Sequence, residues 1–256
     1  MQVDYYSRPE WSYSQMKVIL DSGIDYAVAN KQGKLPKPKS PAIDLGQLAH
    51  MMVLGGSDQF ALSEWPDYRS KAAREWRDGQ EEQGKIVISQ AQWKDIEQIV
   101  TNIEAHPHFK KYMGKGDKAF HELELFAEAG GVKLRGKADY LRKLPNDGLI
   151  ITDLKTTAQF DGWARKAYYS HYDLQAAVYT LIASAATHSN PELTNYYFCV
   201  AETVAPYRVQ FMHTSLEFLE SGERKLRKCI DEINVFGNRE PNFLLDEIKE
   251  LGDYSL

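Results

Sequence analysis

Two segments near the middle of the chain read Gly136-Lys137-Ala138-Asp139 and Leu149-Ile150-Ile151-Thr152-Asp153-Leu154-Lys155-Thr156-Thr157. The second segment is short and rich in β-branched residues, and the turn signal Asn146-Asp147-Gly148 comes directly before it. It is therefore expected to be a mostly buried strand. Residues 132–141 alternate between apolar and polar side chains and end before the same turn, so the two segments predict a β-hairpin.

The predicted hairpin brings two acids together. Successive side chains of a strand point to opposite faces, so Asp153 and Lys155 share a face, and Asp139 can lie beside them from the neighbouring strand. Two adjacent carboxylates repel each other, and a hard divalent cation with oxygen ligands removes that repulsion. The pattern predicts a Mg²⁺ site, with Mn²⁺ as a substitute, at which Lys155 steadies a phosphate anion or helps to activate water. Taken alone, Asp-x-Lys is more often a structural ion pair, because short motifs match freely.

A wider set of motifs resembles one nuclease superfamily. Asp139 followed by Asp153-x-Lys155 resembles the PD-(D/E)xK signature, and Gln175-x-x-x-Tyr179 resembles the helix motif of its RecB-like branch. The details are most similar to the exonuclease VIII (RecE-like) phage recombination nucleases. Besides the two strand segments, the matching pieces are Tyr172-Asp173-Leu174-Gln175-Ala176-Ala177-Val178-Tyr179, Leu45-Gly46-Gln47-Leu48-Ala49-His50 and His121-Glu122-Leu123-Glu124-Leu125-Phe126. They occur in the family's order, between about residue 12 and about residue 179.

The fold class expected is α/β, with a small mixed central β-sheet flanked by helices. The resemblance implies a restriction-endonuclease-like core with an N-terminal helical extension. We expect residues 1–256 to form a single nuclease domain. Within it, residues 1–118 are mainly helical, residues 119–212 hold the catalytic sheet and the Gln/Tyr-motif helix, and residues 213–256 form a C-terminal helix and tail.

The resemblance adds ligands to the predicted metal site. It places His50 beside the metal, although a lone histidine on an apolar helix is ordinarily a packed core residue. The backbone carbonyl of Leu154 is a further expected ligand. In the strand predicted at residues 119–129, the resemblance favours Glu122 as a ligand or as support for the site, with Glu124 in reserve. The alternative for both glutamates is a solvent-facing acidic face.

The helix after the hairpin is expected to contact DNA. Gln175 and Tyr179 are four residues apart and project from one helix face. The resemblance implies that this face points at the active site, where the amide and the phenol hold the DNA backbone or a metal-bound water. Without the resemblance, an exposed Gln175 and a packed Tyr179 would be the better interpretation. Arg165 and Lys166, in the short helix before it, are also expected to bind DNA.

Serines predict where three of the helices begin. Ser12 or Ser14 can cap a helix that runs to Leu20, Ser89 can cap the next long helix, and Ser215 can cap an amphipathic helix that ends at Phe236.

Composition sets limits on function. The 256 residues can bury a sizeable core, and the net charge of −5 is not typical of a nucleic-acid-binding protein. Local basic groups could still bind nucleic acid. Four lysines in and near a turn are either phosphate contacts or ordinary surface residues: Lys110, Lys111, Lys115 and Lys118. Only two cysteines occur, too few for the four-cysteine iron–sulfur cluster of some relatives. With no apolar run or leader of the right kind, we expect no membrane association and a cytoplasmic location.

The resemblance implies a magnesium-dependent exodeoxyribonuclease that degrades double-stranded DNA with free ends from 5′ to 3′. It also implies a ring-like homo-oligomer (trimer or tetramer), a single-strand-annealing partner, and a phage or prophage setting in a bacterial host cell. Two alternatives stay open. One is an endonuclease or single-strand nuclease on the same fold, and the other is a DNA-binding or assembly factor without catalysis.

Overall fold

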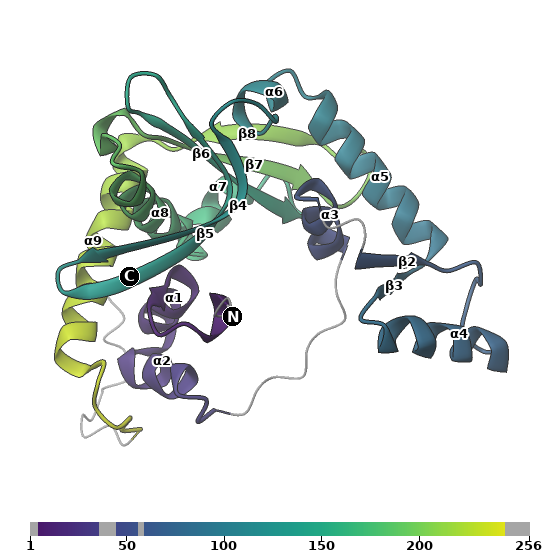
Figure 1. The fold of residues 1–256 in the computed structure, drawn as a ribbon, viewed down its shortest axis with the longest axis horizontal. Helices are drawn as coiled ribbons and strands as arrows, with labels where there is room; N and C mark the ends of the chain where they lie inside the picture. The colour runs from purple at the N-terminus through teal and green to yellow at the C-terminus, as the bar shows by residue number, and fades with distance from the viewer. Residues whose placement is uncertain (1–4, 36–44, 56–58, 244–256) are drawn as a thin grey trace.

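A mixed β-sheet forms the centre of the protein in the computed structural model, which describes residues 5–35, 45–55 and 59–243 (Figure 1). Its strands follow the order β1-β5-β6-β7-β8, and β4 also pairs with β5. The strands are β1 (Trp11–Ser12), β4 (Ala119–Ala129), β5 (Val132–Lys143), β6 (Leu149–Thr157), β7 (Asn195–Glu202) and β8 (Val209–His213). The predicted α/β class with a small mixed sheet is confirmed.

The predicted hairpin is the antiparallel pair β5–β6. Its register runs from Tyr140 opposite Thr152 to Lys143 opposite Leu149. On its other edge β5 pairs with β4 along almost its whole length. Strand β1 runs parallel to β5 and pairs with Leu134 and Arg135. Because β4 occupies one edge, β1 and β6 share the other, and residues 136–139 of β5 lie between them.

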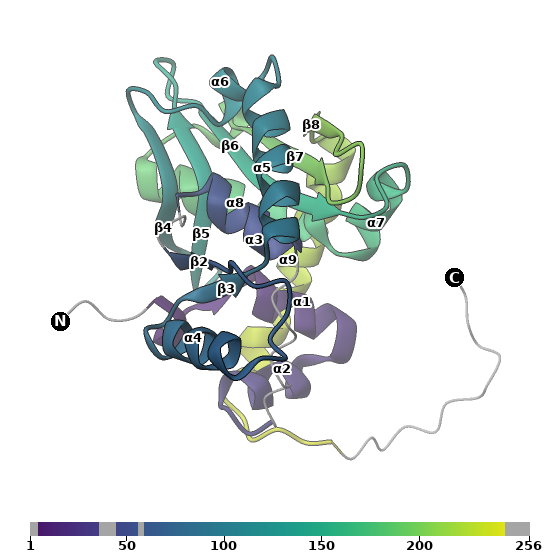
Figure 2. The same cartoon turned by 90° about the vertical axis from the view of Figure 1, so that its right-hand side faces the viewer.

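Helices cover both faces of the sheet (Figures 1 and 2). Strand β5 places Leu134 and Ala138 in one core, which continues into the helices α1, α8 and α9. Tyr140 and Leu154 belong to a second core, on the side of α3, α5 and α6. The helices are α1 (Tyr13–Ser22), α2 (Ile24–Lys31), α3 (Leu45–Val53), α4 (Lys71–Glu82), α5 (Gln90–Ala105), α6 (Phe109–Tyr112), α7 (Trp163–Tyr169), α8 (Tyr172–Thr187) and α9 (Leu216–Phe236), with 3₁₀ turns η1 (Tyr5–Ser7) and η3 (Pro191–Leu193).

The three predicted helix starts are confirmed. Ser12, rather than Ser14, caps α1 and forms a capping box with Gln15. Ser89 forms the same arrangement at the start of α5, and the hydroxyl of Ser215 accepts from the N–H of Phe218 at the start of α9. Each side-chain oxygen satisfies an N–H group that has no partner within the helix, which fixes where the helix begins.

The described part before residue 119 is mainly helical, and besides β1 it contains one more β element. Two short parallel strands, β2 (Phe60–Leu62) and β3 (Ile86–Ile88), pair with each other and flank α4. This unit lies beside α5, at the lower right of Figure 1. In the C-terminal part, α9 is present as expected, and the tail predicted beyond residue 243 lies outside the described residues. Within the described ranges no helix is both long and apolar enough to cross a bilayer.

Candidate active site

Asp139 lies where β5 and β6 part. It comes directly after the last cross-strand pair, Tyr140 and Thr152, in the direction away from the turn. Its carboxylate fills the space between the strands: Oδ2 accepts a hydrogen bond of 2.8 Å from the backbone N–H of Leu154. The same oxygen lies 3.2 Å from Nε2 of His50, which α3 brings in from the other side. The carboxylate is therefore held by two elements that are far apart in the sequence.

Asp153 follows Thr152 on β6 and is buried. The ammonium of Lys155 forms an ion pair with its Oδ2, as expected for side chains on one face of a strand. The amide of Gln175, on α8, donates to its Oδ1 at 2.6 Å. The other end of that amide, Oε1 of Gln175, is buried without a hydrogen-bond partner. An unpaired buried acceptor is costly, so this oxygen is available to a ligand or a water molecule.

The burial of these groups changes their acid–base behaviour. Burial raises the pKa of Asp153 to about 6, although the neighbouring charge of Lys155 acts to lower it. For Lys155, burial acts to lower the pKa, but the charges of Asp153 and Asp139 outweigh it and the pKa is raised. For His50, burial also acts to lower the pKa, and the hydrogen bond to Asp139 overcomes it in the upward direction. Perturbed titrating groups that share a site are typical of functional centres.

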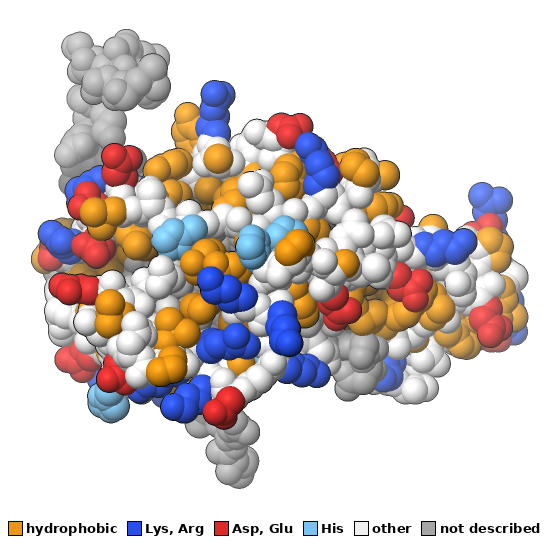
Figure 3. Space-filling model, turned by 90° about the horizontal axis from the view of Figure 1, so that it is seen from above, with side chains coloured by type: hydrophobic (Ala, Val, Ile, Leu, Met, Phe, Trp, Pro, Cys, Tyr) orange, Lys and Arg blue, Asp and Glu red, His pale blue; other side chains and the backbone are white. Residues whose placement is uncertain are grey.

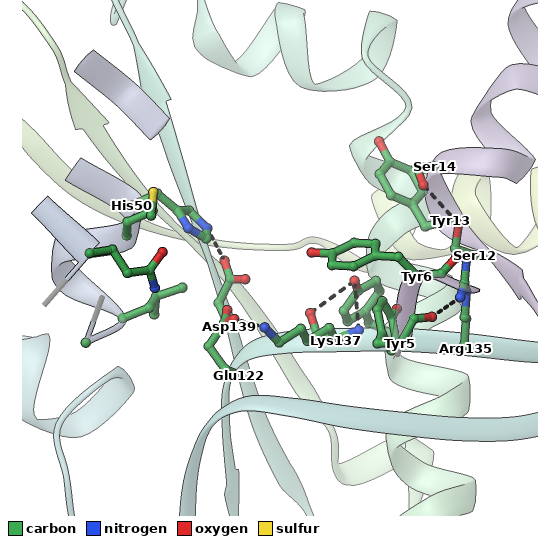
Figure 4. Close-up of a pocket in the computed structure, with 15 residues that line it drawn as sticks. Tyr5, Tyr6, Ser12, Tyr13, Ser14, His50, Glu122, Arg135, Lys137 and Asp139 are labelled. Atoms are coloured by element: carbon green, nitrogen blue, oxygen red, sulfur yellow. Dashed lines mark hydrogen bonds and ion pairs between the residues drawn. The ribbon is translucent and has the colours of Figure 1, made fainter. Parts of the chain in front are cut away.

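A cavity of about 670 Å³ opens beside this cluster (Figure 4). His50 and Asp139 point toward each other on one side, and Glu122 lies next to Asp139. The lining residues described by the structure are Tyr5, Tyr6, Ser12, Tyr13, Ser14, His50, Met51, Leu54, Gly55, Gln59, Glu122, Arg135, Lys137, Asp139 and Tyr179. Asp153, Lys155 and Gln175 are not among them. Asp139 and His50 are thus the members of the cluster that meet the open space, whereas Asp153 is buried away from it.

Glu122, rather than Glu124, faces this cavity. Its carboxylate forms an ion pair with Lys137. Glu122 has a φ of 52°, in the left-handed region, although it belongs to β4. A bulky L-residue rarely adopts this conformation. The alternation of faces expected of a regular strand is therefore interrupted at Glu122, which has no partner in the register of β4 with β5.

The two motif residues of α8 contact different parts of the site. Gln175 is buried against Asp153. Tyr179, unlike Gln175, lines the cavity. Its hydroxyl forms hydrogen bonds with the backbone of Lys137. The alternative of an exposed Gln175 is wrong, and Tyr179 has its hydroxyl satisfied.

Three other predicted site residues, Arg165, Lys166 and Leu154, do not contribute side chains to the described lining of the cavity. Arg165 and Lys166 are exposed on α7 and are absent from the described lining of the cavity. For Leu154, expected to contribute its carbonyl, the structure shows its N–H bonded to Asp139.

Several cavity residues do not emerge as candidates from the sequence. Period-2 counting assigns Lys137 and Arg135 to the same face of the strand as Asp139, and that alternation is the signal that could have identified them. Tyr5, Tyr6 and Tyr13 carry no such signal, because they reach the cavity through the pairing of β1 with β5.

Comparisons with known proteins identify the family and a similar fold. Residues 12–242 match the model of a family described as "PDDEXK-like domain of unknown function (DUF3799)". The chain belongs to this family. No curated protein matches it. The fold is similar to that of a protein from Eubacterium rectale described as a "putative exonuclease", with a TM-score of 0.59 and 20% identity, covering 88% of this chain and 82% of that one. A second solved structure, SSO0001, has a TM-score of only 0.30 at 14% identity, covering 85% of this chain and 95% of that one.

Proposed function

We propose that this protein is a magnesium-dependent nuclease that hydrolyses phosphodiester bonds of DNA, with Asp139 and Asp153 as the metal-holding carboxylates. One observation carries the proposal. Asp139, Asp153 and Lys155 come together where two strands part, in a chain whose family is PDDEXK-like. Membership of this family and the similarity of fold to the Eubacterium rectale protein both support a nuclease.

The donors in the cluster suit a hard cation. Carboxylate oxygens are the ligands that Mg²⁺ prefers, and the unpaired Oε1 of Gln175 is a further neutral oxygen beside Asp153. In the part of the chain that the structure describes, no three His, Cys, Asp or Glu side chains are grouped closely enough to hold a metal by themselves. A magnesium site built from one or two carboxylates, with water and phosphate as the other ligands, is consistent with that finding. Mn²⁺ would be accepted by the same oxygens.

A bound cation would polarise the scissile phosphate and lower the pKa of a coordinated water. The side chains of the chain supply the rest. His50 and the Leu154 N–H orient Asp139, and Gln175 orients Asp153. Lys155 carries a positive charge into a buried site, where it can stabilise charge that develops on phosphate oxygens. Glu122 can support the site from β4 once its ion pair with Lys137 is exchanged for another partner.

The finer parts of the proposal come from the resemblance to RecE-like nucleases. They are exonucleolytic digestion of double-stranded DNA from free 5′ ends, a ring-like trimer or tetramer, an annealing partner, and work in the cytoplasm of a bacterial host during phage-type recombination. The description of the structural neighbour as a putative exonuclease supports exonucleolytic cleavage alone; the duplex substrate and the 5′ polarity come from the resemblance. DNA contacts by Arg165 and Lys166 belong to the same proposal, since both are exposed.

Digestion of end-labelled linear duplex, with and without Mg²⁺, tests the proposal. We expect Mg²⁺-dependent cleavage that is lost in Asp139→Asn and Asp153→Asn. Asp147→Asn is the matched control, because Asp147 is an exposed carboxylate in the turn of the same hairpin and should leave cleavage unchanged. Cleavage by both active-site variants at the wild-type rate would exclude the mechanism. The order of release of the label gives the polarity, and cleavage of covalently closed circles would indicate an endonuclease instead.

A further inference from the structure

Six rings form a continuous cluster at one end of the sheet, away from the cavity. They come from the segment joining α5 to α6, from α6, and from the strands β7 and β8. We call the cluster the aromatic patch; it consists of His106, His108, Tyr112, Tyr197, Phe211 and His213. Neighbouring ring centroids lie 4.2 Å (Tyr112–Tyr197), 4.7 Å (Tyr197–His213), 4.9 Å (His106–Phe211) and 5.5 Å (His106–His108) apart. Each ring therefore contacts the next.

The aromatic patch is at the surface. His108 and His213 are exposed, and the rings between them are partly buried. Tyr112, Tyr197 and Phe211 pack with one side against the second core, so the rings are fixed in place while their outer edges remain accessible. On the face seen in Figure 3, histidine side chains lie among hydrophobic ones near the middle of the molecule.

The surroundings of the patch are basic. Lys110 and Lys111 belong to α6, and the ammonium of Lys111 lies 4.9 Å from the ring centre of Tyr112. Figure 3 shows Lys and Arg side chains beside the histidines on this face. The hydroxyl of Tyr197 and then the ammonium of Lys111 act to lower the pKa of Tyr112, although burial opposes them. Local positive charge here contrasts with the net charge of −5 of the whole chain.

The patch is joined directly to the catalytic strand. The hydroxyl of Thr152 donates to the backbone carbonyl of Tyr112 at 2.7 Å, and Thr152 pairs with Tyr197 across β6 and β7. Thr152 immediately precedes Asp153. Because neighbouring strand residues point to opposite faces, the patch and the ion pair of Asp153 lie on opposite sides of the same strand.

We propose that the aromatic patch binds single-stranded DNA. Fixed rings with accessible edges, next to lysines, are the combination with which proteins hold unpaired strands: bases stack on the rings and the ammonium groups follow the phosphates. Duplex DNA does not offer its base faces, so the patch should favour a single strand. The proposal rests on the proposed nuclease function for the nature of the ligand, since digestion of one strand of a duplex leaves the other unpaired.

The test measures binding of a labelled oligothymidylate of about 12 nucleotides, within the usual range of single-strand site sizes, in chelator so that no cleavage occurs. We expect the double variant His108→Ala/His213→Ala to bind about tenfold more weakly for each base that no longer stacks. Tyr112→Leu keeps apolar bulk against the core and should weaken binding similarly. Lys110→Gln/Lys111→Gln should reduce the slope of log affinity against log salt by about 1.4, which is about 0.7 for each phosphate that is no longer neutralised.

Matched controls are Tyr26→Ala, a ring 45% exposed on α2, and Lys228→Gln, an exposed lysine of α9; both should bind as the wild type does. The histidine variant keeps the test valid if Tyr112→Leu fails to fold, because both histidines are exposed. Wild-type affinity in the histidine and lysine variants would overturn the proposal, and so would an equal loss of affinity for duplex DNA. Asp139→Asn should still bind the oligonucleotide. The two proposals can fail separately. If the protein cleaves no DNA under any condition but the patch variants bind the oligonucleotide more weakly, the nuclease proposal is wrong and the proposal of single-strand binding is supported.

Discussion

The phenol of Tyr179 bonds to the backbone of Lys137 on both sides: the N–H of Lys137 lies 3.3 Å from its oxygen, and the carbonyl of Lys137 lies 3.2 Å away. Lys137 is in the part of β5 between its partners β1 and β6. A tyrosine hydroxyl can accept one hydrogen bond and donate another, so this single group satisfies backbone atoms that a neighbouring strand would otherwise pair. Tyr179 thereby fixes the strand two residues before Asp139.

Tyr179→Phe tests that role. Removing the hydroxyl leaves two polar backbone groups without their partner, which should cost about 1–3 kcal/mol of unfolding free energy. Urea denaturation measures the loss. Cleavage should fall as well, because Asp139 is no longer held in position. The matched control is Tyr26→Phe, at an exposed ring. Unchanged stability in Tyr179→Phe would show that water replaces the phenol at no cost.

The pH dependence of cleavage should report Asp153. Burial raises the pKa of this carboxyl to about 6, and a carboxyl must lose its proton to hold a cation. Activity at limiting Mg²⁺ should therefore be retained above pH 6 and fall as the pH decreases through that value. An ordinary aspartate would keep its activity down to about pH 4. Raising the Mg²⁺ concentration should move the midpoint to lower pH, because cation and proton compete. If the pH midpoint did not change with the Mg²⁺ concentration, the loss of activity at low pH would have to come from a group other than Asp153.

Gln175→Glu should move the same midpoint upward. The Gln175 amide now donates to Oδ1 of Asp153 at 2.6 Å. A carboxylate in its place removes the donor and adds a like charge, and both effects favour the protonated form of Asp153. The readout is the pH profile of cleavage, since a merely structural role for Gln175 would lower the rate without displacing the profile. Gln98→Glu, at an exposed position on α5, is the control for the added charge.

Lys155→Met should destabilise the metal-free protein. The side chains of Lys155 and Asp153 are 17% and 7% exposed, so removal of the ammonium leaves a buried carboxylate without its partner. Breaking a buried ion pair from one side typically costs about 3–5 kcal/mol, whereas replacing both partners is much less costly. Lys155→Met/Asp153→Asn should accordingly recover most of the stability that the single variant loses. Additive losses in urea denaturation would contradict the coupling.

The hairpin and its acids could be predicted because the information is local. A turn signal lies between two patterned segments, so the register of β5 and β6 follows from the chain itself, and with it the approach of Asp139 to Asp153. The serine caps are local in the same sense. Period-2 counting also assigns Lys137 to the face of Asp139.

The remaining parts depend on contacts between distant segments. Strand β1 has two residues and no pattern of its own, yet its pairing with β5 brings Tyr13 to the cavity. The left-handed conformation of Glu122 breaks an alternation that the sequence gives no reason to doubt. The six rings of the aromatic patch are contributed by separate elements, which only the folded chain brings together. Sequence patterns within one segment cannot predict contacts between segments that are far apart in the chain.

The packing of α8 against α9 supplies a final prediction, at Gly222. A Cβ atom there would lie 2.0 Å from the carbonyl oxygen of Asp173, a backbone atom that cannot rotate away. Ser221 and Lys225 bond to the side chain of the same aspartate, so α9 is held against the first turn of α8. Gly222→Ala would force the helices apart, at a cost typical of overpacking, about 1–3 kcal/mol.

The control is Gly79→Ala, inside α4, where an added Cβ meets no atom within 4 Å. Alanine is the better helix former, so this variant should gain up to about 1 kcal/mol. Urea denaturation of both variants gives the comparison, and opposite signs are expected from the same substitution. Because α8 also presents Gln175 and Tyr179 to the site, Gly222→Ala should reduce cleavage while Gly79→Ala leaves it unchanged. A stabilised Gly222→Ala would mean that α8 and α9 approach less closely than their contacts indicate.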